Sequence, residues 1–190
     1  MRINGKEYGL RLTVAAAIET EKVCPEQDIT KIGQILHGDA VEAVRNVIRI
    51  VKILSDGYTE SERHKGRAAK PVEIEEIIDA IGADDLFFSH MVASITETFD
   101  RDYHGKINSK PTKKGREAAK KRGTGKRTIE EALPWYLFFG RRHGMDDEDV
   151  LNTPFGELQD LMTCDAIYHG LAEEVAKKKK LSQEEMLALE

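Results

Sequence analysis

The sequence predicts a mainly α-helical protein that has a small β-hairpin at its start, a flexible basic linker and a small C-terminal helical module. Three observations support this fold class. Apolar residues recur at helical spacing through most of the chain. Asn4-Gly5 separates two short alternating segments, which is a strong hairpin signal. Finally, one strongly basic stretch interrupts an acidic chain. We therefore expect an N-terminal helical module of residues 1–105, a linker of residues 106–127 and a C-terminal helical module of residues 128–190.

The expected linker differs from its surroundings in charge and in apolar content. Residues 106–127 hold ten Lys/Arg and one acidic residue, whereas the whole chain has a net charge of −5. The two flanking modules are both acidic. Ile107 is the single branched aliphatic residue of the linker, too little apolar surface to offset the entropy of ordering it. We therefore expect a flexible or conditionally ordered segment in which residues 116–122 can form a turn or two of helix.

Polar capping residues mark the first helices of the N-terminal module. Thr13 is placed to cap a helix over residues 14–22, which Pro25 stops. Asp28 is placed to cap a short helix that ends near Leu36. Asp39 is placed to cap the next helix.

That next helix, residues 40–54, carries aliphatic residues over more than one stripe, which predicts a central position in its module. The polar residues 55–70 predict a loop. Pro71 then suits the first turn of a helix that ends at Gly82. A longer helix is expected over residues 84–99, with one apolar face formed by Phe88, Val92, Ile95 and Phe99.

The C-terminal module begins with a capping box, because Glu131 follows Thr128 at the required spacing. The helix that follows contains Pro134, where it either kinks or restarts, and it ends at Gly144. Asp146 is placed to cap a short acidic helix.

Thr153-Pro154 then starts a long helix. A single apolar seam is expected along it, with Lys177–Lys180 complementing the negative C-terminal end of the helix dipole. The seam consists of Leu161, Cys164, Tyr168, Leu171 and Val175.

No motif for catalysis, cofactor binding or metal binding is present in the sequence. The six histidines are scattered, and none falls in a zinc-binding pattern. Neither Cys24 nor Cys164 has a redox or metal spacing, and no apolar run approaches the ~20 residues of a membrane span. We expect a soluble intracellular protein that is not an enzyme and has no cofactor, metal or membrane contact.

The basic linker has two interpretations. Clustered Lys/Arg can bind phosphate and release counterions, which would make the linker a nucleic-acid arm. It has no aromatic residue for base stacking, and both flanking modules are acidic. A solvated linker that docks on an acidic protein surface is therefore favoured over direct nucleic-acid binding.

Four aromatic residues, Trp135, Tyr136, Phe138 and Phe139, lie within five positions of one helix. Side chains at these positions point around the whole helix, so a single core contact cannot bury them all. They either fill the core of a small helical module or form in part a surface for docking a partner, where aromatic residues and Arg are enriched. The second interpretation would include Arg141 and Arg142.

The segment PWYLFFGRRHGM, residues 134–145, is followed by EDVLNTPFGELQDL, residues 148–161. Together they resemble the C-terminal module of tail assembly chaperones from long-tailed bacteriophages. The rest of the chain is similar in architecture, with a helical N-terminal module, a Lys-rich junction and a short second module. In that family a long form is often made by a ribosomal frameshift near the junction, beside a more abundant short form.

The resemblance implies a protein that acts in the host cytoplasm and is absent from the mature virion. Its first module would coat the tape-measure protein, and its second module would recruit tail-tube subunits. The shorter form of the same protein is a further expected partner, and self-association of the first module is left open. For tube-subunit capture we predict Trp135, Tyr136, Phe138, Phe139, Arg141 and Arg142. The alternative function is a nucleic-acid-associated adaptor that binds through residues 106–127.

Overall fold

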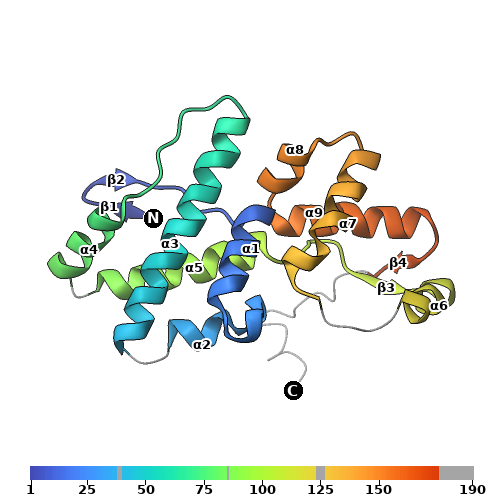
Figure 1. The fold of residues 1–190 in the computed structure, drawn as a ribbon, viewed down its shortest axis with the longest axis horizontal. Helices are drawn as coiled ribbons and strands as arrows, with labels where there is room; N and C mark the ends of the chain where they lie inside the picture. Colours follow the sequence, from blue (N-terminus) through green and yellow to red (C-terminus); the bar gives the residue numbers. More distant parts are fainter. Residues whose placement is uncertain (38–39, 85, 123–126, 176–190) are drawn as a thin grey trace, which may run out of the picture. The chain divides into compact units, whose positions relative to one another are not determined.

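The chain folds mainly into helices and has a β-hairpin at its start, as the sequence predicts (Figure 1). The computed structural model describes residues 1–37, 40–84, 86–122 and 127–175, without the side chains of residues 121 and 122. Asp39 and Lys177–Lys180, to which the sequence assigns helix-end roles, lie outside the described residues. Within the described part of the chain, no helix combines the length and the apolar character that crossing a membrane requires.

The elements follow one another along the chain with short connections. The helices are α1 (Val14–Val23), α2 (Ile32–Leu36), α3 (Ala40–His64), α4 (Ile74–Ala83), α5 (Phe87–Asp102), α6 (Lys113–Arg122), α7 (Ile129–Arg142), α8 (Asp147–Asn152) and α9 (Phe155–Tyr168). Two short 3-10 helices, Pro25–Gln27 and Ile29–Lys31, precede α2. The strands are β1 (Arg2–Ile3), β2 (Lys6–Glu7), β3 (Ser109–Pro111) and β4 (Ala172–Glu174).

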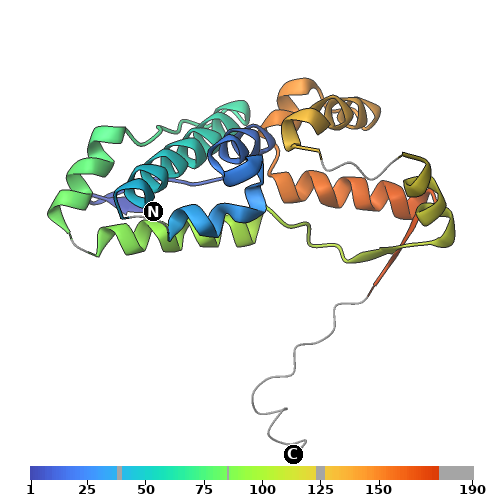
Figure 2. The ribbon, with the colours of Figure 1, turned by 60° about the horizontal axis from the view of Figure 1, so that its bottom comes forward.

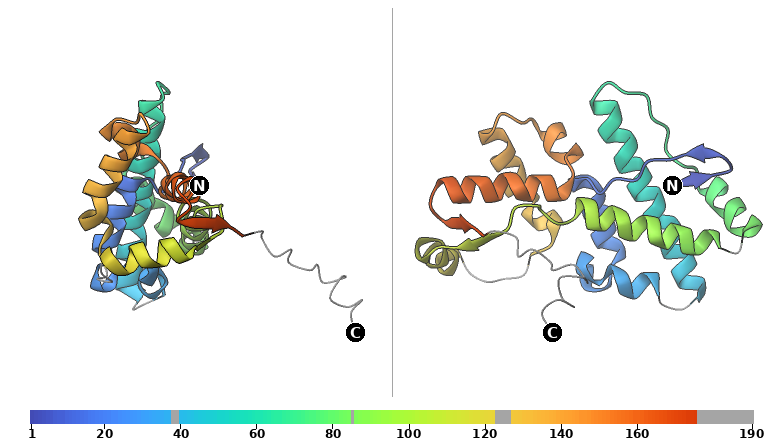
Figure 3. Two further views of the ribbon diagram at one scale, coloured as in Figure 1. Left: turned by 90° about the vertical axis from the view of Figure 1, so that its right-hand side faces the viewer. Right: turned by 180° about the vertical axis from the view of Figure 1, so that it is seen from behind.

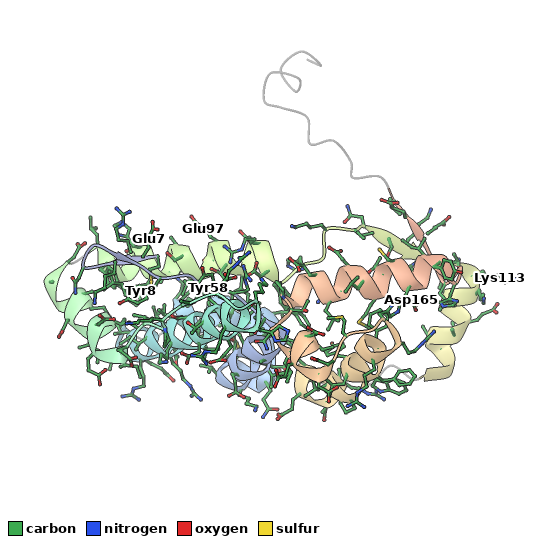
Figure 4. All side chains as sticks on the ribbon, turned by 90° about the horizontal axis from the view of Figure 1, so that it is seen from above. Glu7, Tyr8, Tyr58, Glu97, Lys113 and Asp165 are labelled. Atoms are coloured by element: carbon green, nitrogen blue, oxygen red, sulfur yellow. The ribbon has the colours of Figure 1, made fainter. Side chains whose placement is uncertain are left out.

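The N-terminal hairpin is confirmed. β1 and β2 pair antiparallel, and both residues of the intervening turn have positive φ, 47° at Asn4 and 78° at Gly5. A type I′ turn needs this conformation at both central positions, and Asn-Gly tolerates it well. After the hairpin, Gly9 lies against the ring of Tyr58 on α3, so a larger residue would overlap that ring. Figure 4 labels Tyr58.

The described residues form two compact units, which divide the chain differently from the expected modules. Unit 1 contains residues 1–106 and 127–162, and unit 2 contains residues 107–122 and 163–175. The expected boundaries were 1–105, 106–127 and 128–190. The physical reason is that residues 128–162 share backbone hydrogen bonds with the N-terminal segment. The Phe155 N–H donates to the Leu12 carbonyl, and the Val14 N–H donates to the Thr153 carbonyl.

Helix α3 is central in unit 1, as its broad apolar surface predicts. Helices α1, α2, α4, α5 and α8 all pack against it, and Figure 2 shows it within this group. Its fully buried apolar side chains are Val47, Ile50, Val51 and Leu54.

Residues 55–64 continue α3, which corrects the prediction of a loop over residues 55–70. Four of their polar residues, Ser55, Thr59, Ser61 and Glu62, are buried and have hydrogen-bond partners. Ser55 Oγ accepts from the backbone N–H of Val72 at 2.9 Å, and Ser61 Oγ accepts from the Arg11 guanidinium at 3.0 Å. The buried Glu62 carboxylate accepts from Arg67 at 3.1 Å. Each of these bonds joins residues on either side of a turn or a longer loop. Local sequence does not reveal such partners.

The next two helices begin later than predicted. Pro71 precedes α4 instead of occupying its first turn, because the buried Val72 donates its N–H to Ser55 and the following Glu73 is extended. Helix α5 runs to Asp102 instead of Phe99. The carboxylate of Asp102 accepts from the Leu12 N–H at 3.0 Å and from Arg101, which stabilises the extra turn.

In unit 2, helix α9 ends at Tyr168, which corrects the predicted seam to Val175. Gly170 has φ 67°, and the Leu171 N–H donates to the Ala166 carbonyl at 2.8 Å. This is the Schellman pattern of a helix end. β4 follows and pairs antiparallel with β3, where Lys110 and Glu173 form an ion pair.

The expected flexible linker of residues 106–127 thus contains a strand, β3, and a helix, α6. Thr112 accounts for the start of α6. Its Oγ1 accepts from the Gly115 N–H at 3.1 Å, and its own N–H donates to the Leu171 carbonyl at 3.0 Å. Gly115 lies so close to that carbonyl that a Cβ would overlap it. Partners from residues 170–171, distant in sequence, therefore order a segment that has almost no apolar surface.

Candidate partner-binding site

Helix α7 begins at the predicted capping box. The Glu131 N–H donates to Thr128 Oγ1 at 3.1 Å, and the Thr128 N–H donates to the Glu131 carboxylate at 3.0 Å. A third acceptor comes from α1, because the carboxylate of Glu21 accepts from the Ile129 N–H at 2.6 Å. Burial raises the pKa of Glu21, and its backbone hydrogen bonds oppose that rise. Unit 1 therefore holds the first turn of α7 firmly.

The inner face of α7 lies in the core of unit 1. Phe139 is 9% exposed, and the ring of Tyr136 meets Phe155 edge-on at 6.1 Å between centroids. Burial raises the pKa of the Tyr136 hydroxyl. Gly140 faces α8 so closely that a Cβ there would overlap Val150, which is fully buried. Phe139 is thus a core residue, and Tyr136 is partly buried against the core.

The C-terminal end of α7 is fixed as well. Gly144 has φ 80°, and the Met145 N–H donates to the Gly140 carbonyl at 3.0 Å, which completes a Schellman pattern. Arg141 donates two hydrogen bonds, of 2.8 and 2.6 Å, to the carboxylate of Asp147. This guanidinium lowers the pKa of Asp147.

The outer face of α7 exposes the other two aromatic residues. Trp135 is 61% exposed and Phe138 is 56% exposed, and their rings meet edge to face at 6.3 Å between centroids. Arg142 is exposed one turn beyond Phe138. We call Trp135, Phe138, Arg141 and Arg142 the α7 face.

The structure thus divides the predicted site residues between two environments. Both interpretations of the aromatic cluster hold in part. Phe139 is buried in the core and Tyr136 is partly buried against it, whereas Trp135 and Phe138 are exposed. Periodicity alone could not make this division, because four adjacent aromatic residues fit any orientation of the helix. That the α7 face binds a partner stays a prediction.

A second uncovered apolar face lies on α4, and sequence reasoning did not single it out. Four isoleucines, Ile74, Ile77, Ile78 and Ile81, recur at helical spacing along α4. In the structure Ile77 is fully buried, whereas Ile74 is 42% and Ile78 is 53% exposed. The signal in the sequence that could have found this face is the width of the apolar surface. Isoleucines at these positions span more of the helix circumference than one packing contact covers.

Side chains that could ligate a metal or act as nucleophiles are dispersed over the described residues. In the described residues, no three His, Cys, Asp or Glu side chains gather in a geometry that could hold a metal ion. Burial raises the pKa of the Cys24 thiol to about 11, so this thiol is protonated at neutral pH. A groove of about 560 Å³ lies between α1, α3 and α8. Charged side chains at its rim pair with one another, as Glu60 does with Arg63 and His64 with Asp149.

Comparison of the chain with protein-family models, with curated proteins and with solved structures gave no match.

Proposed function

We propose that this protein is a phage tail assembly chaperone that acts in the host cytoplasm and leaves before the tail is complete. Its N-terminal part covers the apolar surface of the tape-measure protein, and its α7 face captures a tail-tube subunit. The observation that carries the proposal is the exposed pair Trp135 and Phe138 on a helix fixed at both ends. The resemblance of residues 134–161 to the C-terminal module of such chaperones gives the kind of partner.

The composition of the α7 face supports a docking role. Trp and Arg are the residue types most enriched among binding hot spots, and large exposed aromatic side chains on a monomer often mark an interaction site. The inner face and both ends of α7 are held by unit 1, so little conformational entropy is lost when a partner docks. A pre-organised aromatic pair with an adjacent guanidinium therefore suits tight and specific capture.

The direct test is binding of the purified tail-tube protein to a Trp135→Ala/Phe138→Ala variant. We expect affinity to fall by about a hundredfold or more, because each truncated hot-spot side chain typically costs about 2 kcal/mol. Both residues are exposed, so the melting temperature should change little. The control is Ile74→Ser/Ile78→Ser, which removes an exposed apolar pair of similar spacing on α4. Unchanged tube binding by the α7 variant, or an equal loss in the α4 variant, would reject the assignment.

The partners can be identified in cells that are producing phage. An N-terminal tag retains both forms of the protein, and mass spectrometry identifies what is bound. A tape-measure protein, a tube protein and a shorter chain that ends near residues 113–127 would support the chaperone together with frameshifting. The first two without the shorter chain would support the chaperone alone. Retention of neither protein would overturn the proposal.

A second candidate, a nucleic-acid-associated adaptor, is favoured by one observation. Helix α6 exposes Lys113, Lys114, Arg116 and Lys120 along a single short element, and Figure 4 marks Lys113 at its start. Such clusters bind phosphate with an affinity that falls steeply with salt. The measurement is binding to a labelled single-stranded oligonucleotide at several NaCl concentrations. Binding that disappears when these four residues are changed to Gln, while tube capture persists, would favour the adaptor.

A further inference from the structure

We propose that the outer face of α4 binds an amphipathic α-helix that carries Lys or Arg beside its apolar seam. This surface, the α4 face, consists of Ile74, Glu75, Ile78 and Asp79. The proposal rests on the proposed function in one respect, which is the identity of the partner. Under that function, the protein that carries the helix is the tape-measure protein.

The exposed apolar residues of α4 lie on one side of the helix. Ile77 and Ala80 pack inward, where α4 contacts α3, α5 and β1, and Figure 3 shows α4 at the margin of these elements beside the hairpin. Ile74 and Ile78 are one turn apart and lie beside this inward-facing pair, where they remain exposed. Leu86, in the turn directly after α4, is 64% exposed. A partner helix laid along α4 would therefore cover apolar surface that no described residue covers.

The charge around this stripe has a single sign. Residues 71–100 contain eight Asp/Glu and no Lys or Arg. Glu73, Glu75, Asp79 and Asp84 are all exposed. Glu76 has a cationic partner, since it pairs with Lys6 of the hairpin at 3.0 Å and also accepts from the Tyr8 hydroxyl at 2.6 Å. Glu75 and Asp79 lie four residues apart, where like charges on a helix repel.

These charges select the occupant. The α4 face of a second copy would place carboxylates against carboxylates, which is unfavourable. An uncharged apolar helix would bury Ile74 and Ile78 and would leave the carboxylates beside them without partners at a desolvated rim. A helix with Lys or Arg beside its apolar seam covers the isoleucines with its apolar residues and its methylene stems, and it neutralises the acidic rim.

The test uses the full-length protein and two labelled synthetic peptides of about 18 residues, five helical turns. Both peptides carry the same leucine seam, flanked by Lys in one and by Glu in the other. Fluorescence anisotropy should detect binding of the Lys peptide and not of the Glu peptide. Changing Ile74→Ser/Ile78→Ser should weaken binding by about tenfold or more, and Glu75→Gln/Asp79→Asn by about fivefold with a smaller dependence on salt.

The matched control is Trp135→Ser/Phe138→Ser, which removes exposed apolar surface from α7 and should leave peptide binding unchanged. All altered residues are exposed, and circular dichroism can verify that each variant is folded. Equal binding of both peptides, or unchanged binding by the α4 variants, would overturn the proposal. Salt-sensitive self-association of the wild-type protein that Ile78→Ser abolishes would also overturn it, since the occupant would then be a second copy. Failure of both the tape-measure protein and the tube protein to co-purify would overturn the proposed function and would leave the peptide result unaffected.

Discussion

Helices α7 and α4 each expose two apolar side chains about one turn apart, but the two helices are supported differently. A capping box and Glu21 hold the start of α7, and a Schellman turn with the Arg141–Asp147 pair holds its end. The N-cap residue of α4, Glu73, makes no side-chain capping bond. Similar exposure therefore does not mean similar pre-organisation. Under the binding roles proposed above, we expect the α7 face to take a partner of fixed shape and the α4 face to accept partner helices whose apolar residues differ.

The largest expected effect tests the support under α7. Changing Gly140→Val should destabilise the protein by about 3 kcal/mol, because the added side chain overlaps Val150 in a packed interface. Urea unfolding measures this loss. Stability within about 0.5 kcal/mol of wild type would show that α7 and α8 can move apart, and the contrast with α4 would then disappear.

Removing the Glu21 carboxylate should cost about 2 kcal/mol, since Glu21→Ala leaves the Ile129 N–H buried without its acceptor. The measurement is again urea unfolding, with Glu19→Ala as an exposed control on the same helix. A loss no larger than that of the control would mean that the capping box alone holds α7.

The same carboxylate predicts a pH dependence. Its pKa is raised in the folded state, so the folded protein binds this proton more tightly than the unfolded chain does. The stability that this group contributes is present below its unfolded pKa of about 4.5 and is lost as the pH rises through the raised value. In Glu21→Gln this component is absent, so stability should fall less between about pH 4 and pH 7. Parallel pH profiles of the two proteins would contradict the prediction.

A smaller effect of opposite sign is expected in α4. Gly82 lies inside the helix, and a Cβ there would meet nothing within 4 Å. Changing Gly82→Ala should therefore stabilise the protein by about 0.5–1 kcal/mol through helix propensity. Thermal unfolding measures the change. A destabilised variant would show that α4 needs the glycine for a contact outside the described residues.

The smallest effect concerns His64, at the end of α3. Its ring donates a hydrogen bond to the Asp149 carboxylate of α8 at 2.7 Å, and this hydrogen bond raises the pKa of His64. The resulting stabilisation is present below about pH 6.5 and is lost as the pH rises through the raised pKa. An NMR titration should find the pKa of His64 lower in Asp149→Asn than in the wild type. Equal values would show that the pair does not form in solution.

Local sequence predicted the features that depend on neighbouring residues. The Asn4-Gly5 hairpin, the Thr13 cap, the capping box at Thr128 and the cap at Asp146 all involve residues within a few positions of one another. The central place of α3 also followed, because its broad apolar surface needs several partners. These predictions are confirmed.

Local sequence did not reveal features whose partners are distant. The polar end of α3 is helical because Ser61 and Glu62 bind Arg11, about fifty positions earlier. Helix α6 is ordered through Leu171, and α9 stops where Gly170 adopts a positive φ instead of following the apolar seam. At the candidate site, the sequence named the aromatic cluster but could not say which members face solvent. That depends on α8, which contacts α7 through Gly140.

The backbone bonds between residues 12–14 and residues 153–155 bear on any shorter form of this chain. A polypeptide that ended near residue 127 would lack the donors and acceptors that these residues supply to Leu12 and Val14, and it would lack the Ile129 N–H that meets Glu21. The residues that remain in such a form would not keep the surface that they have in the long form. It would uncover part of the interior of unit 1 as new surface, so two translation products of one gene would present different binding surfaces from the same residues.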